Sequence, residues 1–157
     1  MIEIKRIEVD DCKKELKEAL ELAWNVFSIF DAPEYPEEGV REFQNYVQYD
    51  IIAPRVKREE LAIWGAYEGK TLVGMSALRR PSHISLLFVA PKHHRRGIAR
   101  ALFETMLHEV ITNSAVQYLS VKSSPYAVDV YRKLGFVAAA EGEQIKNGIR
   151  FTTMMYI

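Results

Sequence analysis

The spacing of apolar residues divides the N-terminal part of the chain into one strand and two helices. Residues 2–9, IEIKRIEV, alternate in part between apolar and charged side chains and indicate a strand. From Lys13 to Phe30 the apolar residues predict a helix with one buried stripe, at Leu16, Leu20, Trp24 and Phe27. The prolines of DAPEYPEEG interrupt this pattern before a second amphipathic helix, whose apolar side carries Val40, Phe43, Tyr46 and Val47. Residues 51–60 fit either a short helix or a loop.

The rest of the chain reads as strands broken by two helices. LAIWGAY and TLVGMSAL predict a hairpin with Gly69 in its turn, and the apolar run HISLLFVA predicts a central strand. A helix is expected from about Gly97 to Ile111. A strand follows at VQYLSVK, then a helix over 125–134 and two strands at FVAAAEG and IRFTTMMYI. This order predicts a mixed α/β fold, with residues 1–157 as a single domain.

Composition and charge narrow the functional classes. Lysine plus arginine and aspartate plus glutamate both number 21, so no overall field attracts nucleic acid or an anionic membrane. Cys12 is the only cysteine, which rules out an internal disulfide and fits a reducing compartment. No apolar run approaches the roughly 20 residues of a spanning helix, and the N-terminus lacks the apolar centre of a signal peptide. We therefore expect a soluble cytoplasmic protein with no nucleic-acid or membrane partner.

The most unusual stretch is VAPKHHRRGIARAL, residues 89–102. A metal site is disfavoured, because adjacent histidines diverge and no cysteine or carboxylate lies nearby in the sequence. A nucleic-acid surface needs a broader basic face than this short cluster. A solvated basic surface remains open when the cluster is taken alone. Its position between an apolar strand and a helix favours a fourth interpretation, which is a phosphate site.

That interpretation rests on the start of the helix. A helix N-terminus exposes unpaired backbone N–H groups and carries about half a positive charge. Gly97 and Ala99 are small enough to let an anion approach the backbone closely, and the preceding loop adds basic side chains. The stretch lacks both the Gly-Lys-Ser/Thr of a P-loop and the three glycines of the dinucleotide fingerprint. The pattern therefore predicts a pyrophosphate cradle of another type.

A second motif, SSPYAVDVYRKLGF, carries helix signals at both ends. Ser124 is a good N-cap, and Pro125 suits the first helical position. Gly135 suits the left-handed conformation that ends a helix. Tyr131 lies on this helix, where a tyrosine is ordinarily a core residue.

These two stretches resemble the signatures of the GNAT N-acetyltransferase superfamily. The first is similar to its acetyl-CoA pyrophosphate loop, Gln/Arg-x-x-Gly-x-Gly/Ala, with the matching positions at His94, Gly97 and Ala99. The second is similar to Asn-x-x-Ala-x-x-x-Tyr-x-x-x-Gly-Phe, with the matching positions at Ser124, Ala127, Tyr131, Gly135 and Phe136. His94 stands where the family usually has Gln or Arg, and Ser124 replaces the usual Asn.

The resemblance implies a fold and a reaction. The fold is α/β (α+β), with a mostly antiparallel sheet of six to seven strands, about four flanking helices and a splay after the fourth strand. The reaction is direct transfer of an acetyl group from acetyl-CoA to an amine on a small molecule or peptide, without a metal. C-terminal strands of this family often pair across subunits, which leaves a homodimer open. A non-catalytic acyl-CoA-binding or regulatory module on the same fold is the alternative.

The resemblance also assigns residues. Backbone groups of the splayed strand would hold pantetheine and stabilise the oxyanion, at Leu87, Phe88 and Val89. The loop and the second motif would hold the rest of the cofactor, through His94, Arg95, Arg96, Gly97, Ile98, Ala99, Arg100, Ser124, Ala127 and Tyr131. Tyr131 would also act as the general acid that protonates the leaving thiolate.

The amine loses its proton to a base either directly or through water, and the sequence offers more than one candidate for that base. His83 is the first candidate, because strand alternation would place it on the same face as Val89. Glu34, Glu37 and Glu38 are rivals in the loop where the family builds its acceptor site. The expected acceptor contacts are Phe30, Glu34 and Tyr35, and the glutamates suggest a cationic acceptor.

Overall fold

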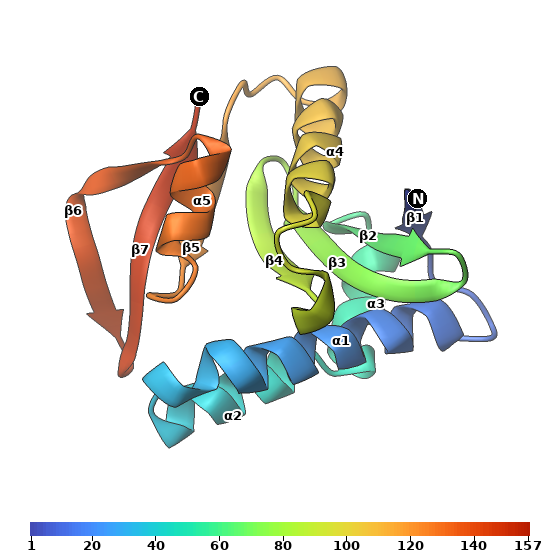
Figure 1. Cartoon of the computed structure of the whole chain (residues 1–157), viewed down its shortest axis with the longest axis horizontal. Coiled ribbons are helices and arrows are strands. Elements are labelled where there is room, and N and C mark those ends of the chain that lie inside the picture. Colours follow the sequence, from blue (N-terminus) through green and yellow to red (C-terminus); the bar gives the residue numbers. More distant parts are fainter.

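All seven strands form one sheet in the order β1-β2-β3-β4-β5-β7-β6 (Figure 1). The structure is a computed structural model that describes residues 1–157. Every pair of neighbouring strands is antiparallel except β4 and β5, which are parallel. The strands are β1 (Ile2–Ile7), β2 (Leu61–Glu68), β3 (Thr71–Arg79), β4 (His83–Val89), β5 (Leu119–Ser123), β6 (Val137–Lys146) and β7 (Ile149–Tyr156). The predicted fold class is confirmed.

Five α-helices and two short 3₁₀ helices connect the strands. They are α1 (Lys14–Phe30), η1 (Ala32–Glu34), α2 (Glu37–Tyr46), α3 (Tyr49–Lys57), η2 (Pro91–His93), α4 (Ile98–Asn113) and α5 (Val128–Leu134). The ambiguous segment after α2 is therefore a helix. α5 begins at Val128, later than predicted, because the residues from Ser124 to Ala127 form a turn closed by the Ala127 N–H. No helix combines the length and the apolar character that a bilayer crossing requires.

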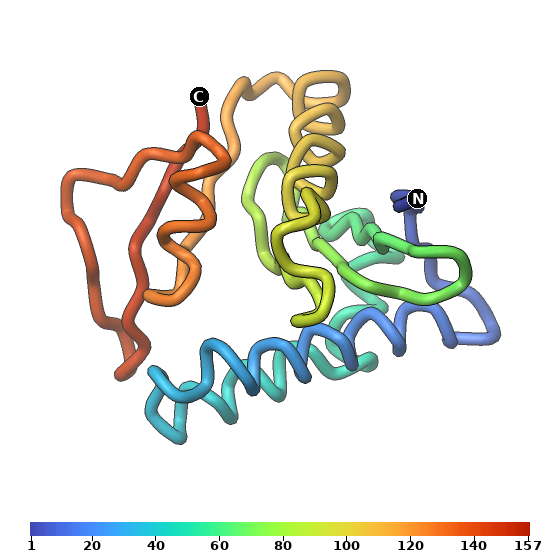
Figure 2. The backbone as a smooth tube through the Cα atoms, viewed as in Figure 1, coloured from blue at the N-terminus to red at the C-terminus, as the bar shows by residue number.

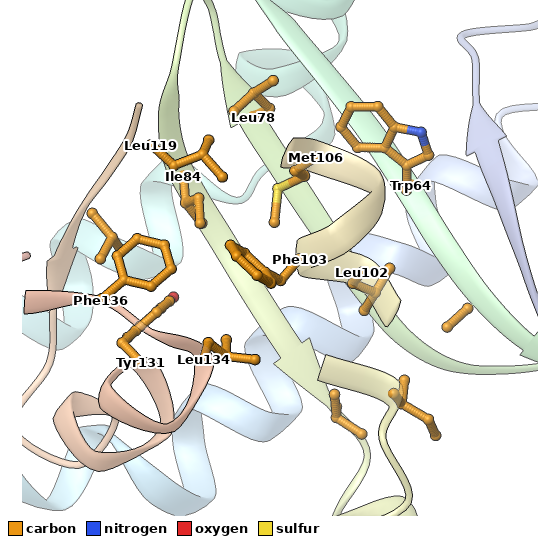
Figure 3. Close-up of a cluster of buried hydrophobic side chains, with 14 of the residues drawn as sticks. Trp64, Leu78, Ile84, Leu102, Phe103, Met106, Leu119, Tyr131, Leu134 and Phe136 are labelled. Atoms are coloured by element: carbon orange, nitrogen blue, oxygen red, sulfur yellow. The ribbon is translucent and has the colours of Figure 1, made fainter. Parts of the chain in front are cut away.

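The sheet separates two hydrophobic clusters. One lies under α4 and α5 and includes Trp64, Leu102 and Phe103, while the other lies under α1 and α3 and includes Leu16 and Ile52. In the first cluster, Phe103 of α4 reaches the C-terminal part of the sheet, with its ring centroid 5.5 Å from that of Phe136 (Figure 3). This packing ties the two halves of the sheet together.

The two halves part along β4 and β5. These strands pair only at His83 with Ser120 and at Ile84 with Val121, and then diverge (Figure 2). β4 continues for five residues without a partner on that side. The splay expected after the fourth strand is therefore present, and the C-terminal end of α1 lies across it (Figure 1).

A bulge in β4 changes which side chains share a face. Leu78 pairs with Ile84 but Ala77 pairs with Leu86, so Ser85 is the extra residue. As a result Ile84 and Val89 belong to the same cluster although five positions separate them. His83, next to Ile84, faces the opposite side. The expectation that His83 and Val89 share a face is wrong, because simple alternation does not cross a bulge.

Core packing around α4 gives a stability prediction. Leu102 is fully buried in the first cluster, whereas Ile111 on the same helix is 52% exposed. Leu102→Ala should lower the free energy of unfolding by about 2–5 kcal/mol in urea denaturation, because it leaves a cavity. Ile111→Ala should change it by less than about 0.5 kcal/mol. Equal effects of the two substitutions would contradict this placement of α4.

Candidate functional site

A cavity of about 460 Å³ lies between the end of β4 and α5, on the side where β4 has no partner strand. Its wall comes from the end of α1, the end of β4, the loop into α4, and α5 with the turn before it. Twelve of the residues expected to bind cofactor or acceptor line it: Phe30, Leu87, Phe88, Val89, His94, Arg95, Gly97, Ile98, Ala99, Arg100, Ala127 and Tyr131. The structure thus brings most of the predicted site together around one space.

Backbone groups of β4 face this cavity. The Ala90 N–H donates to the Val73 carbonyl of β3 at 2.8 Å, so the Val89 carbonyl of the same planar peptide points the other way, into the gap. By strand alternation the backbone groups of Leu87 also face the gap, whereas those of Phe88 face β3. Leu87 and Val89 therefore supply the backbone groups that have no partner strand, and Phe88 contributes only its side chain.

The N-terminus of α4 closes one end of the cavity. Gly97 has a φ of +79°, a left-handed conformation that other residues rarely adopt, and no atom lies within 4 Å of where a Cβ would sit. The first N–H of the helix to find a backbone partner is that of Ala101, which bonds to the Gly97 carbonyl. The N–H groups of Ile98, Ala99 and Arg100 thus remain free for an anion.

Three basic side chains stand at this end. Arg95, Arg100 and Lys133 line the cavity and are exposed at its mouth. Arg100 donates to the Lys133 carbonyl at 2.9 Å, which joins α4 to the end of α5. Lys133 was not among the predicted site residues. From the sequence, Lys133 is simply a basic residue in the last turn of a helix, where positive charge is favoured. Only the fold shows that it lies beside Arg100.

Arg96 does not face the cavity. Its guanidinium donates to Glu68 at the end of β2 at 2.6 Å, and His93 contacts the same carboxylate at 3.4 Å. The hydrogen bond from Arg96 lowers the pKa of Glu68. Arg96 therefore braces the loop against the neighbouring hairpin, and its predicted cofactor contact stays a prediction.

His94 folds into the cavity. Its Nε2 donates to the Val89 carbonyl at 2.8 Å, since a carbonyl only accepts. The imidazole centroid lies 5.1 Å from the Phe30 ring, which in turn stacks on Tyr126 at 4.9 Å. His93 and His94 thus point to different partners, as adjacent histidines were expected to do. The three rings form an aromatic wall across the cavity.

A carboxylate that sequence reasoning missed lies beside this wall. Asp31 directly follows α1, lines the cavity and is 7% exposed. Ser124 Oγ donates to its Oδ1 at 2.7 Å. Burial raises the pKa of Asp31 from its ordinary 3.8 to about 6, an effect that the Ser124 hydrogen bond opposes and the nearby charge of Glu34 reinforces. Asp31 lies four positions after Phe27, so it continues the buried stripe of α1 just beyond the end of the helix. A carboxylate at such a position is the signal by which the sequence could have revealed this residue.

Ser124 contacts the cavity only through its partners. Its Oγ both donates to Asp31 and accepts from the Ala127 N–H at 3.3 Å, which is the capping contact expected from the sequence. It is not among the residues that line the cavity. Ser124 therefore fixes the position of Asp31, and its predicted contact with a cofactor stays a prediction.

Tyr131 projects from α5 toward β4 (Figure 3). Its side chain is buried in the first hydrophobic cluster and lines the cavity. Burial, together with the charge of Asp31, raises the pKa of Tyr131 well above its ordinary value. The hydroxyl is therefore neutral across the physiological range, so it is available as a hydrogen-bond donor.

The structure does not bring the expected bases to the cavity. His83 lies where β4 and β5 still pair, with Nδ1 2.9 Å from Ser120 Oγ, and is not a lining residue. Burial and the charges of Arg79 and Lys122 lower the pKa of His83 to about 4. Its ring is thus uncharged at neutral pH but is a weak base.

The three glutamates that follow Asp31 in the sequence also lie outside the cavity wall. Glu34, Glu37 and Glu38 are exposed, and Glu37 contacts Arg41 at 3.4 Å. Tyr35 packs edge-on against the Phe27 ring at 5.2 Å, away from the cavity lining. Of the three predicted acceptor contacts, only Phe30 lines the cavity.

Comparison with known proteins identifies the family. The model of the acetyltransferase (GNAT) domain matches residues 31–157. The chain belongs to the GNAT acetyltransferases. The match contains both sequence motifs and every residue of the cavity wall except Val26 and Phe30. Comparison with curated proteins gives no match.

Solved structures share the fold of this GNAT chain at low identity. A GCN5-related N-acetyltransferase from Rhodopseudomonas palustris has a TM-score of 0.79 and 20% identity, over 98% of this chain and 93% of its own. The PaiA N-acetyltransferase of Thermoplasma acidophilum, solved with coenzyme A, has a TM-score of 0.77 and 18% identity, over 99% and 98%. ElaA of Escherichia coli has a TM-score of 0.69 and 15% identity over the full length of both chains.

The buried carboxylate gives a pH prediction. Because the pKa of Asp31 is raised on folding, the stability it contributes is complete below its ordinary pKa of 3.8 and is lost as the pH rises through about 6. This difference in pKa corresponds to on the order of 3 kcal/mol. Asp31→Asn should remove this loss, so urea denaturation should show the variant gaining stability over the wild type between about pH 4 and pH 6. A difference that does not change with pH would contradict the burial of Asp31.

Proposed function

We propose that the protein transfers an acetyl group from acetyl-CoA to an amine by direct attack of the amine on the thioester. The observation that carries this proposal is the cavity that lies where β4 and β5 have separated. One end of this cavity is formed by Gly97, whose backbone no other atom covers, and by the free N–H groups at the start of α4. Family membership and the coenzyme A bound to the PaiA neighbour support it.

The residues present fit this cofactor. A pyrophosphate needs N–H donors and positive charge, which the start of α4 offers together with Arg95, Arg100 and Lys133. The pantetheine arm carries amide groups, which suit the backbone groups of Leu87 and Val89 that face the gap. When bound, acetyl-CoA supplies an activated acyl group with a thiolate as the leaving group.

Each step of the transfer has a protein group suited to it. A backbone N–H on β4 that faces the gap would stabilise the negative charge that develops on the thioester oxygen. Tyr131 would donate a hydrogen bond to the departing sulfur. Since the pKa of its hydroxyl is raised, Tyr131 keeps its proton at neutral pH and has an O–H to donate to the sulfur. The acceptor would approach past Phe30, from the side on which α1 ends.

Binding can be tested apart from chemistry. Acetyl-CoA should raise the melting temperature, because it binds only the folded protein; about 100 times the Kd should add about 2.7 kcal/mol of stability. Gly97→Glu should abolish this shift, since it places bulk and negative charge at the helix N-terminus. Gly142→Glu is the matched control, because Gly142 also has positive φ and open space but lies on β6. A wild type that shows no shift refutes the proposed cofactor.

Chemistry can be tested at Tyr131. Tyr131→Phe keeps the buried ring but removes the donor, so kcat should fall about 100-fold or more in a thiol-release assay while the acetyl-CoA shift persists. Tyr126→Phe is the control, because it keeps the ring that stacks on Phe30. An unchanged kcat in Tyr131→Phe would remove this tyrosine from the mechanism. Binding of acetyl-CoA without acetylation of any amine would favour the non-catalytic alternative.

A further inference from the structure

Asp31 is a buried carboxylate without a cationic partner. It belongs to none of the ion pairs in the protein, and its one side-chain hydrogen bond comes from Ser124. A carboxylate offers about four acceptor sites, so most of its capacity is unused. Burying such a group is unfavourable unless a positive charge pairs with it. The protein itself supplies no cation to Asp31, so a ligand with a positive charge would find an unpaired carboxylate there.

The surroundings of Asp31 show what kind of partner fits. The titratable groups that act on it are Glu34 and Tyr35 from the segment after α1 and Tyr131 from α5. They are acidic, or neutral until high pH, so they add negative and not positive charge. The cations of the cavity, Arg95, Arg100 and Lys133, belong to the α4 end and the end of α5. The cavity thus has a cationic mouth for phosphate and a separate anionic position.

The anionic position lies beside aromatic surface and beside the proposed leaving-group donor. Phe30 precedes Asp31 in the chain and stacks on Tyr126 in the same cavity wall. Tyr131 lines that cavity and lies close enough for the charge of Asp31 to raise its pKa. A positively charged group held by Asp31 would therefore lie near the reacting end of the cavity.

We propose that Asp31 binds the ammonium group of the acceptor and takes one of its protons, so that the acceptor is a primary amine that is positively charged at neutral pH. This inference rests on the proposed acetyl transfer. It adds the residue that holds the ammonium group and receives its proton.

The protons balance as follows. An ammonium carries three hydrogens on nitrogen; the Asp31 carboxylate takes the first, which frees the lone pair that forms the new carbon–nitrogen bond. The carbon–sulfur bond breaks with its electron pair on sulfur. The second hydrogen leaves nitrogen and is taken up by the thiolate, and the third stays on the amide. Asp31 then releases its proton to solvent.

Asp31 is better suited to this role than the bases expected from the sequence. An imidazole is ordinarily a stronger base than a carboxylate, but burial has reversed this order here. The pKa of Asp31 is raised to about 6 and that of His83 is lowered to about 4. Asp31 is therefore the stronger base, and it lines the cavity while His83 does not. Glu34, Glu37 and Glu38 are exposed and lie outside the wall.

The test compares two amines and two variants. Both amines are offered as acceptors together with acetyl-CoA. At neutral pH 2-phenylethylamine is an ammonium ion that must lose a proton before it can attack, whereas aniline is already uncharged. Asp31→Asn should lower kcat/KM for 2-phenylethylamine about 100-fold and should have a much smaller effect on aniline. Glu38→Gln, which changes an exposed carboxylate outside the cavity wall, should resemble the wild type for both amines.

Two further readouts do not depend on a single rate. In the wild type, kcat/KM for 2-phenylethylamine should rise with pH through about 6. This rising limb of the pH profile should be absent from Asp31→Asn. Ser124→Ala removes the hydrogen bond that favours the ionised carboxylate, so the limb should move to higher pH. With coenzyme A in place of acetyl-CoA, 2-phenylethylamine should add to the melting temperature of the wild type but not to that of Asp31→Asn.

Several outcomes would overturn the inference. Equal losses on the two amines would mean that Asp31 only supports the fold, and an unchanged rate would mean that it plays no part. If Asp31→Asn does not fold, an unshifted limb in Ser124→Ala overturns the inference instead. A wild type that binds acetyl-CoA but acetylates neither amine also overturns it, because no ammonium then reaches Asp31. Failure of acetyl-CoA to bind the wild type refutes the proposed function itself.

Discussion

Strands β4 and β5 share only two residue pairs before they separate, and this early parting leaves a row of backbone hydrogen-bonding groups with no partner on one side. Buried groups of this kind are costly unless something else satisfies them. The packing of Phe103 against Phe136 joins the two halves through α4, in place of the strand pairing that is absent here. The position of the cavity, the exposure of the α4 N-terminus and the placement of α5 all follow from this constraint.

Charge is distributed unevenly around the cavity. Arg95, Arg100 and Lys133 surround the end at which α4 begins, whereas Asp31 directly follows α1 and has only the Ser124 hydroxyl as a side-chain partner. The chain as a whole carries no formal net charge, so these differences act only over the short range of the cavity. One surface therefore provides for an anionic and a cationic group at the same time.

The sequence predicts the fold and the open N-terminus of α4 because their signals are local. Apolar periodicity defines α1 and α4, and a strand, a basic loop and Gly97 follow one another within a few residues. The rest depends on contacts between distant segments. Asp31 is buried against Ser124, which lies 93 positions away, and Arg96 is held by Glu68 from another strand. The bulge at Ser85 depends on the register with β3, which periodicity in β4 alone does not reveal.

The hydrogen bond from His94 to the Val89 carbonyl bears on how tightly any ligand can bind. An amide that takes this carbonyl must first displace the imidazole, so one hydrogen bond is exchanged for another and little free energy is gained at this point. Affinity then has to come from the phosphate end and from apolar contact. The Val89 carbonyl instead discriminates between ligands. A ligand that displaces the His94 imidazole without offering a hydrogen-bond donor of its own leaves this carbonyl unsatisfied.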